Sequence, residues 1–94
     1  MPVEIVGQQL RIHVRTPKGA TGFATHDVGR IGRLQRVSAY YPGYGWKTQS
    51  WRLNLRDYNS LDYVISSINS LRGVSPYTKS KAIYLAKQWF KRKR

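Results

Sequence analysis

The sequence has no cysteine and only four acidic residues in 94 positions. Without cysteine the chain can form neither a disulfide bond nor a thiolate metal site. A two-metal nuclease needs clustered carboxylates, whereas the four here are scattered, and no P-loop, GxSxG or HExxH motif is present. We therefore expect a non-enzymatic protein with no metal and no cofactor. The acidic residues are Glu4, Asp27, Asp57 and Asp62.

Long apolar segments are also missing. No apolar run approaches the length of about 18 residues that suggests a membrane span, and the first residues lack the basic start and apolar stretch of a signal peptide. These absences predict a cytoplasmic protein with no membrane association. The small size and lack of linkers favour a prokaryotic or viral source, so the protein would be nucleoid-associated or viral.

Positive charge is abundant. The chain has 17 Lys and Arg residues and a formal net charge of +13. A domain of this size cannot cancel such a charge internally, and it repels itself unless an anionic partner or counterions screen it. Nucleic acid is the simplest such partner, because each phosphate contact releases condensed counterions.

The first part of the chain, residues 1–56, has the pattern of strands and loops. Residues 3–6 and 9–15 predict a strand pair, since apolar and polar side chains alternate in the second segment. A short strand is expected within 23–28. The clearest hairpin joins residues 34–41 to residues 46–55 through Tyr-Pro-Gly-Tyr-Gly.

Alternation also predicts which side chains of this hairpin share a face. In the second arm Trp51, Leu53 and Leu55 would face the core. In the first arm Val37 and Ala39 would face it as well. The remaining side chains of both arms would then point to the solvent.

Helical patterns occupy the rest of the sequence. Apolar residues recur at helical spacing through 59–72, where Asn59 or Ser60 can cap the helix and Gly73 ends it. A second helix is expected over 76–92, with Ser75 as its cap and Pro76 at its first position. The whole chain, 1–94, is thus a single α+β domain. It would have an N-terminal antiparallel sheet of about 3–5 strands and two C-terminal helices packed on one sheet face.

The open face of this sheet is the first candidate for a nucleic-acid surface. Its expected side chains combine cations, aromatic rings and hydroxyl groups without any acid, although an ordinary solvated face is the alternative. Arginine pairs with phosphates or guanine edges, and aromatic rings stack on unpaired bases. The set is Arg11, His13, Arg15, Arg36, Ser38, Tyr40, Trp46, Thr48, Ser50 and Arg52.

The last helix is the second candidate. Its exposed face would carry lysines and tyrosines with no acidic residue to pair them, since none occurs after Asp62. Ordinary exposed helices mix charges of both signs, so this face could lie along a nucleic-acid backbone; a solvated face is again the alternative. It comprises Tyr77, Lys81, Tyr84, Lys87, Gln88 and Lys91.

Two glycine-containing segments complete the candidates. In Gly29-Arg30-Ile31-Gly32-Arg33 the glycines would let the backbone approach phosphates, with Arg30, Arg33 and Arg36 supplying charge. A flexible turn explains this segment equally well. Around Gly43 and Gly45 the aromatic residues could reach a groove or a base, although simple turn chemistry is favoured there.

These patterns favour a DNA-binding protein that contacts mainly the phosphate backbone, with weak sequence preference. DNA is favoured over RNA. A homodimer is consistent with the size, because symmetry doubles the contact area. The residues expected to bind are Arg11, Arg15, Arg30, Arg33, Arg36, Tyr40, Trp46, Arg52, Lys81, Tyr84, Lys87 and Lys91.

Three other functions remain open at this point. A ribosome-associated or viral RNA-binding protein would show the same phosphate attraction. A metal-independent ribonuclease toxin could use His13 or His26 for proton transfer. A module that docks on an acidic protein partner would also need the surplus charge.

Overall fold

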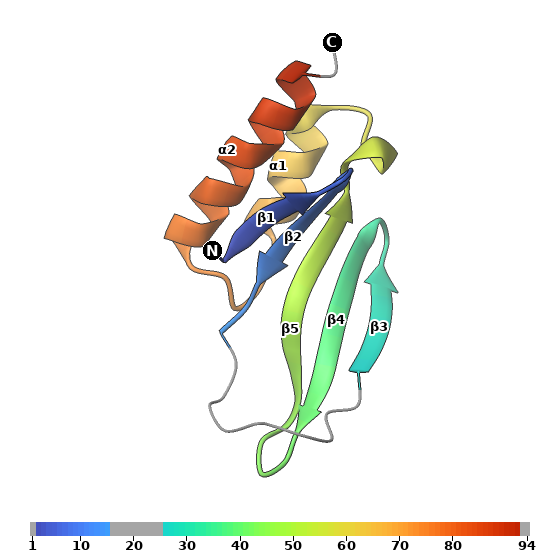
Figure 1. The fold of residues 1–94 in the computed structure, drawn as a ribbon, viewed down its shortest axis with the longest axis vertical. Coiled ribbons are helices and arrows are strands. Elements are labelled where there is room, and N and C mark those ends of the chain that lie inside the picture. The colour runs from blue at the N-terminus through green and yellow to red at the C-terminus, as the bar shows by residue number, and fades with distance from the viewer. Residues whose placement is uncertain (1, 16–25, 93–94) are drawn as a thin grey trace.

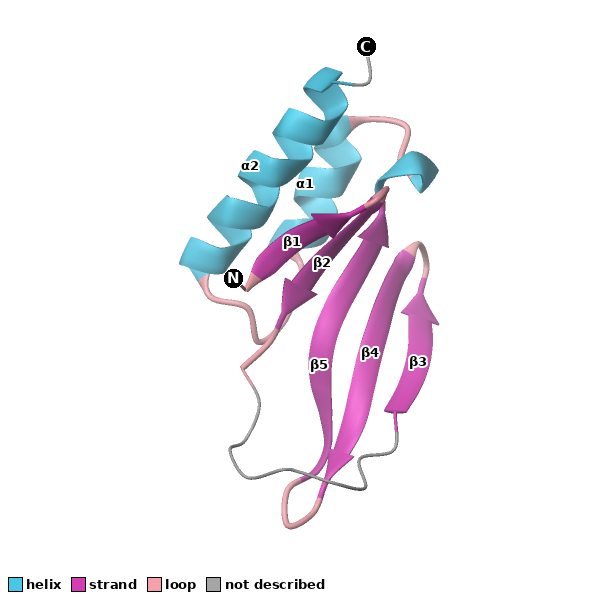
Figure 2. Cartoon of the chain, in the orientation of Figure 1, coloured by secondary structure: helices cyan, strands magenta, loops and turns pink. Residues whose placement is uncertain are grey.

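The computed structural model describes residues 2–15 and 26–92 of the chain. Within these residues, five strands form one antiparallel sheet in the order β1-β2-β5-β4-β3, and the helices follow in sequence (Figure 1, Figure 2). This arrangement confirms the α+β fold predicted from the sequence. The elements are β1 (Val3–Val6), β2 (Gln9–His13), β3 (His26–Ile31), β4 (Leu34–Tyr41), β5 (Gly45–Asn54), a 3-10 turn (Leu55–Asp57), α1 (Leu61–Asn69) and α2 (Pro76–Arg92).

Both helices lie on one face of the sheet, and α2 runs along β1 and β2 (Figure 1). Alternation in β2 and in the second half of β5 turns their apolar side chains toward the helices. The resulting core is tightly closed, since its central side chains have no exposed surface. These are Leu10, Ile12, Leu53, Leu55, Val64, Ile68, Ala82 and Ala86.

The start of α2 is capped as the sequence predicted. The Thr78 N–H donates to the Ser75 hydroxyl at 3.2 Å, which satisfies one of the free donors of the first turn. The first helix is shorter than the expected 59–72, because it ends at Asn69 and not at Gly73. Ser70 closes its end, with its hydroxyl donating to the Ser67 carbonyl at 2.7 Å.

One half of the sheet extends beyond the helices (Figure 1). This half, called the ribbon below, consists of β3, β4 and residues 45–50 of β5. Its tip is a tight turn in which the Tyr44 N–H donates to the Tyr41 carbonyl at 2.8 Å. Pro42 and Gly43 occupy the central positions, and the φ of 84° at Gly43 is one that L side chains rarely adopt.

The ribbon contains a β-bulge that changes which side chains share a face. Val37 pairs with Ser50, but the next residue, Ser38, pairs with Thr48. Between these two pairs β5 advances by two residues while β4 advances by one, so Gln49 is the extra residue of the bulge. Beyond this point the alternation of β5 is out of phase with its second half.

The expected face assignments are wrong in the ribbon, at Trp46 because of the bulge and at Arg36 and Tyr40 because β4 has the opposite phase to the expected one. Arg36 pairs with Trp51, whose side chain lies in the core, so Arg36 points to the helix side of the sheet. Tyr40 follows by alternation, and its partner Trp46 lies with it. The two rings meet edge to face with centroids 5.9 Å apart.

The side chains of β4 that alternate with Arg36 and Tyr40 face away from the helices. Val37, Ala39 and Tyr41 are all buried, yet they are not part of the cluster beneath the helices. Val37 and Ala39 were expected on the helix side. Ser38 and Ser50 are buried as well, so neither contributes to a solvated surface.

The short strand expected within 23–28 is only partly testable, because residues 23–25 lie outside the described part of the chain. β3 begins at His26 and continues to Ile31, through the glycine-spaced segment. Neither helix within residues 26–92 is long and apolar enough to cross a membrane.

Candidate nucleic-acid interface

Three arginines line up across the sheet on the face away from the helices. Strand pairing places Arg30 opposite Gln35, Gln35 opposite Arg52, and Arg52 opposite Arg11. These residues form the arginine row, defined as Arg11, Arg30 and Arg52. Neighbouring strands lie about 4.8 Å apart, so the row runs across four adjacent strands with Gln35 between two of the arginines.

The row concentrates charge at a cost to the isolated protein. Like charges directly opposite each other on neighbouring strands are destabilising, and Arg11 and Arg52 form such a pair. The buried Nε atom of Arg52 has no hydrogen-bond partner. An anion lying on this face would relieve the repulsion and could accept hydrogen bonds from the guanidinium groups.

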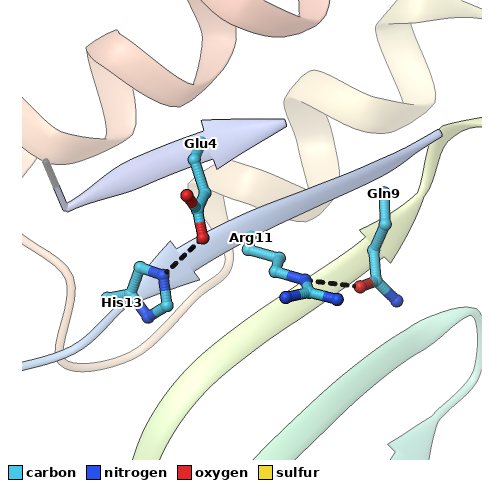
Figure 3. Close-up of polar contacts among 4 residues, drawn as sticks. All are labelled: Glu4, Gln9, Arg11 and His13. Atoms are coloured by element: carbon cyan, nitrogen blue, oxygen red, sulfur yellow. Dashed lines mark hydrogen bonds and ion pairs between the residues drawn. The ribbon is translucent and has the colours of Figure 1, made fainter. Parts of the chain in front are cut away.

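Polar contacts lie at the Arg11 end of the row (Figure 3). Arg11 donates from Nε to Oε1 of Gln9 at 2.7 Å, which fixes its side chain along β2. Beside it, Nε2 of His13 lies 3.3 Å from Oε1 of Glu4. Glu4 also stands opposite Arg11 in the pairing of β1 with β2.

A pocket of about 400 Å³ adjoins the row on the same face. Gln49, the bulge residue, points into it and donates to the Tyr41 hydroxyl at 2.8 Å. The pocket is therefore lined by the guanidinium of Arg52, the imidazole of His13 and the amide of Gln49. Its lining is His13, Val14, Val37, Tyr41, Gln49, Ser50 and Arg52.

The outer side of α2 forms a second basic surface. It is called the α2 surface and comprises Tyr77, Lys81, Tyr84, Lys87 and Lys91. Tyr77 and Tyr84 are 67% and 59% exposed, and Nζ of Lys81 lies 5.7 Å from the centre of the Tyr77 ring. The opposite side of the helix buries Ala82 and Ala86 completely.

The remaining predicted site residues lie apart from these two surfaces. Arg36, Tyr40 and Trp46 form an exposed patch on the helix side of the ribbon. Arg33, in the turn between β3 and β4, lines a pocket with side chains of α1. Arg15 lies at the sheet edge, in a pocket beside the start of α2.

The predicted single sheet surface is thus divided between two sides of the sheet. Arg11 and Arg52 stay together as expected, and Arg30 joins them, whereas Arg36, Tyr40 and Trp46 do not. Sequence reasoning missed Gln35 and Gln49. Only strand register could have revealed both, because their positions depend on which residues face each other across β4 and β5.

Comparison with known proteins gives no further guide: no family model, no curated protein and no solved structure matches this chain. In the described residues, no three His, Asp or Glu side chains come together as a metal ion would need.

Proposed function

We propose that this protein binds duplex DNA, mainly through its phosphate backbone, and that the arginine row is the principal contact. The observation that carries the proposal is the direct opposition of Arg11 and Arg52, with Arg30 in line, on a sheet face that no helix covers. The folded protein tolerates the repulsion between these arginines. DNA phosphates would attract the same side chains and offset that repulsion.

The shape of the ribbon favours DNA over RNA. A two-stranded antiparallel ribbon fits the major groove of B-DNA, which is about 12 Å wide. The major groove of A-form RNA is too deep and narrow for protein side chains to read. Among the described residues, the tip of the β4–β5 hairpin beyond Ala39 pairs with no third strand, and it extends beyond the helices (Figure 1), so it has this shape.

A salt series of fluorescence-anisotropy titrations with labelled duplex DNA tests the proposal. Each phosphate contact contributes about −0.9 to the slope of log K against log salt. Arg11→Gln/Arg52→Gln should therefore reduce the magnitude of the slope by about 2, from the loss of two contacts. Arg56→Gln/Arg72→Gln removes the same charge elsewhere and should change the slope much less.

Competition experiments separate the other partners. Single-stranded DNA and structured RNA should displace the labelled duplex less effectively than unlabelled duplex does. RNA that competes better than DNA would establish an RNA-binding protein instead. Heparin that competes as well as DNA would favour docking on an acidic protein, and a slope near zero would refute the proposal.

The contact of Glu4 with His13 favours ribonuclease activity as a second candidate function. Glu4 can orient the imidazole, and the arginine row can stabilise charge on a phosphate beside it. His13 would take the proton of a 2′-hydroxyl, whose oxygen attacks phosphorus while the bond to the 5′-oxygen breaks. The leaving 5′-oxygen then takes a proton from solvent water, and His13 returns its own proton to the solvent.

Cleavage of end-labelled RNA tests this second candidate. Wild-type protein should generate 2′,3′-cyclic phosphate ends, and His13→Ala should abolish cleavage while DNA binding is retained. His26→Ala is the matched histidine variant and should leave cleavage unchanged. Intact RNA after long incubation with wild-type protein would eliminate the candidate.

A further inference from the structure

The two basic surfaces point away from each other. The arginine row lies on the sheet face opposite the helices, as the pairing of Arg52 with Arg11 shows. The α2 surface lies on the outer side of the helix layer, because Ala82 and Ala86 on the reverse of α2 are completely buried in the core. The sheet and the body of α2 separate them.

Each surface is able to attract phosphates without the other. A helix with its side chains is about 10–12 Å across, and the sheet adds to this separation. Screening limits electrostatic interactions between exposed charges to about 10 Å at 0.1 M salt. Phosphates bound on the arginine row therefore leave the lysines of the α2 surface largely unneutralised.

The α2 surface has the composition of a binding surface in its own right. Lys81, Lys87 and Lys91 supply three positive charges, and among the described residues none of them forms an ion pair with a carboxylate. Tyr77 and Tyr84 add two exposed rings, whose hydroxyl groups can donate to phosphate oxygens. Charge complementarity identifies a polyanion as the occupant.

We propose that one molecule of this protein bridges two DNA duplexes, one on the arginine row and the other on the α2 surface. The inference rests on the proposed function and adds a second, separate DNA site. Duplex DNA is stiff, with a persistence length of about 150 base pairs. A short duplex cannot bend around the molecule to reach both surfaces, so the second surface takes a second duplex.

Capture of one duplex by another tests bridging directly. A biotin-labelled duplex is held on streptavidin beads, and a fluorescent duplex of about 30 base pairs, a length far below the persistence length, is added with the protein at about 0.1 M salt. Captured fluorescence should rise with protein concentration. It should fall again at excess protein, when each duplex carries its own molecules.

Three variants that each lose two charges locate the sites. Arg11→Gln/Arg52→Gln and Lys87→Gln/Lys91→Gln should each reduce capture at least tenfold, while each still binds a single duplex in anisotropy titrations. Arg56→Gln/Arg72→Gln is the matched control, and it should capture the second duplex as well as wild-type protein does.

A dimer that uses the same surface twice would also capture a second duplex. The two variants distinguish the two mechanisms. If each molecule bridges alone, both variants lose capture and mixing them does not restore it, whereas a dimer that uses one surface twice keeps full capture in the variant of the other surface and overturns the inference. Light scattering of the DNA-free protein should show a monomer.

Two further outcomes separate this inference from the proposed function. Normal binding of one duplex without capture by wild-type protein would overturn bridging and leave the proposed function intact. Capture that persists in both surface variants would also overturn it. Failure of wild-type protein to bind any duplex would overturn the proposed function and the bridging inference together.

Discussion

Beneath the helices the sheet closes its apolar side chains into one core, whereas in the ribbon it leaves large aromatic rings in the solvent. Leu10 and Leu53 have no exposed surface, but Tyr40 and Trp46 are 43% and 54% exposed. Both halves belong to the same sheet, and β5 runs through both (Figure 1). The halves therefore differ in what covers them, and the bulge at Gln49 also interrupts the backbone pairing of the ribbon.

This difference separates stability from recognition. Apolar burial stabilises the half under the helices by about 25 cal/mol per Å² of surface removed from water. The ribbon gains less from burial on its helix side, where its exposed rings and Arg36 can meet a partner. Changes to the buried apolar side chains of the first half should alter folding, and changes to the exposed rings of the ribbon should alter binding.

The largest expected effect is on folding. Leu53→Ala removes a fully buried side chain from the centre of the core, and such truncations cost about 2–5 kcal/mol of unfolding free energy. Urea denaturation followed by circular dichroism measures the loss. Tyr44→Ala at the ribbon tip, where the ring is 60% exposed, should cost about 0.5 kcal/mol or less. Similar losses of unfolding free energy in both variants would contradict the proposed difference between the two halves of the sheet.

The next effect is on binding. Tyr40→Ala/Trp46→Ala should weaken binding to single-stranded DNA by about 1–3 kcal/mol for each base that stacks on these rings, as measured by anisotropy with a labelled oligonucleotide. Tyr63→Ala on α1 removes a ring that is 62% exposed and serves as control. An equal loss with the control would mean that the ribbon rings have no special role.

A smaller effect on folding tests the helix layer. Ser75→Ala removes the hydroxyl that accepts from the Thr78 N–H, and loss of such a cap costs about 1 kcal/mol. Ser60 holds the equivalent position before α1 but makes no side-chain capping bond. Ser60→Ala should therefore have the smaller effect on the urea midpoint, and the reverse order would contradict the assigned caps.

The smallest effect should be a gain in the ribbon. An added Cβ at Gly29 meets no atom within 4 Å, and its φ is not in the left-handed region. Gly29→Ala should then stabilise the protein by about 0.4–1 kcal/mol, because it restricts the unfolded chain. Thermal unfolding measures this gain, and a lower midpoint would show that the ribbon needs a glycine there.

Local patterns predicted the half under the helices well. The bounds of β1 and α2 are the predicted 3–6 and 76–92, since alternation and a Ser-Pro helix start are signals carried by neighbouring residues. The bounds of β4, in the ribbon, are also the predicted 34–41. Arg11 and Arg52 were placed on a common face for the same reason. Their direct opposition required the register of β2 with β5, which no local pattern contains.

The ribbon was less predictable, and two causes account for the errors there. Gln49 has no property that distinguishes a bulge from a regular strand position, yet it reverses the face of Trp46 relative to Arg52. An alternation pattern cannot reveal such a phase change. The errors at Arg36 and Tyr40 have the second cause, which is the assumption that Val37 faces the helices.

The two ends of the central strand, β5, should also differ in how easily their backbone hydrogen bonds open. Leu53 and Lys47 belong to the same strand, but one lies in the closed core and the other beside the exposed tip. Amide hydrogens near the tip should exchange through local fraying, while those at the core end should need global unfolding. A partner can thus reshape one end of β5 without loosening the other.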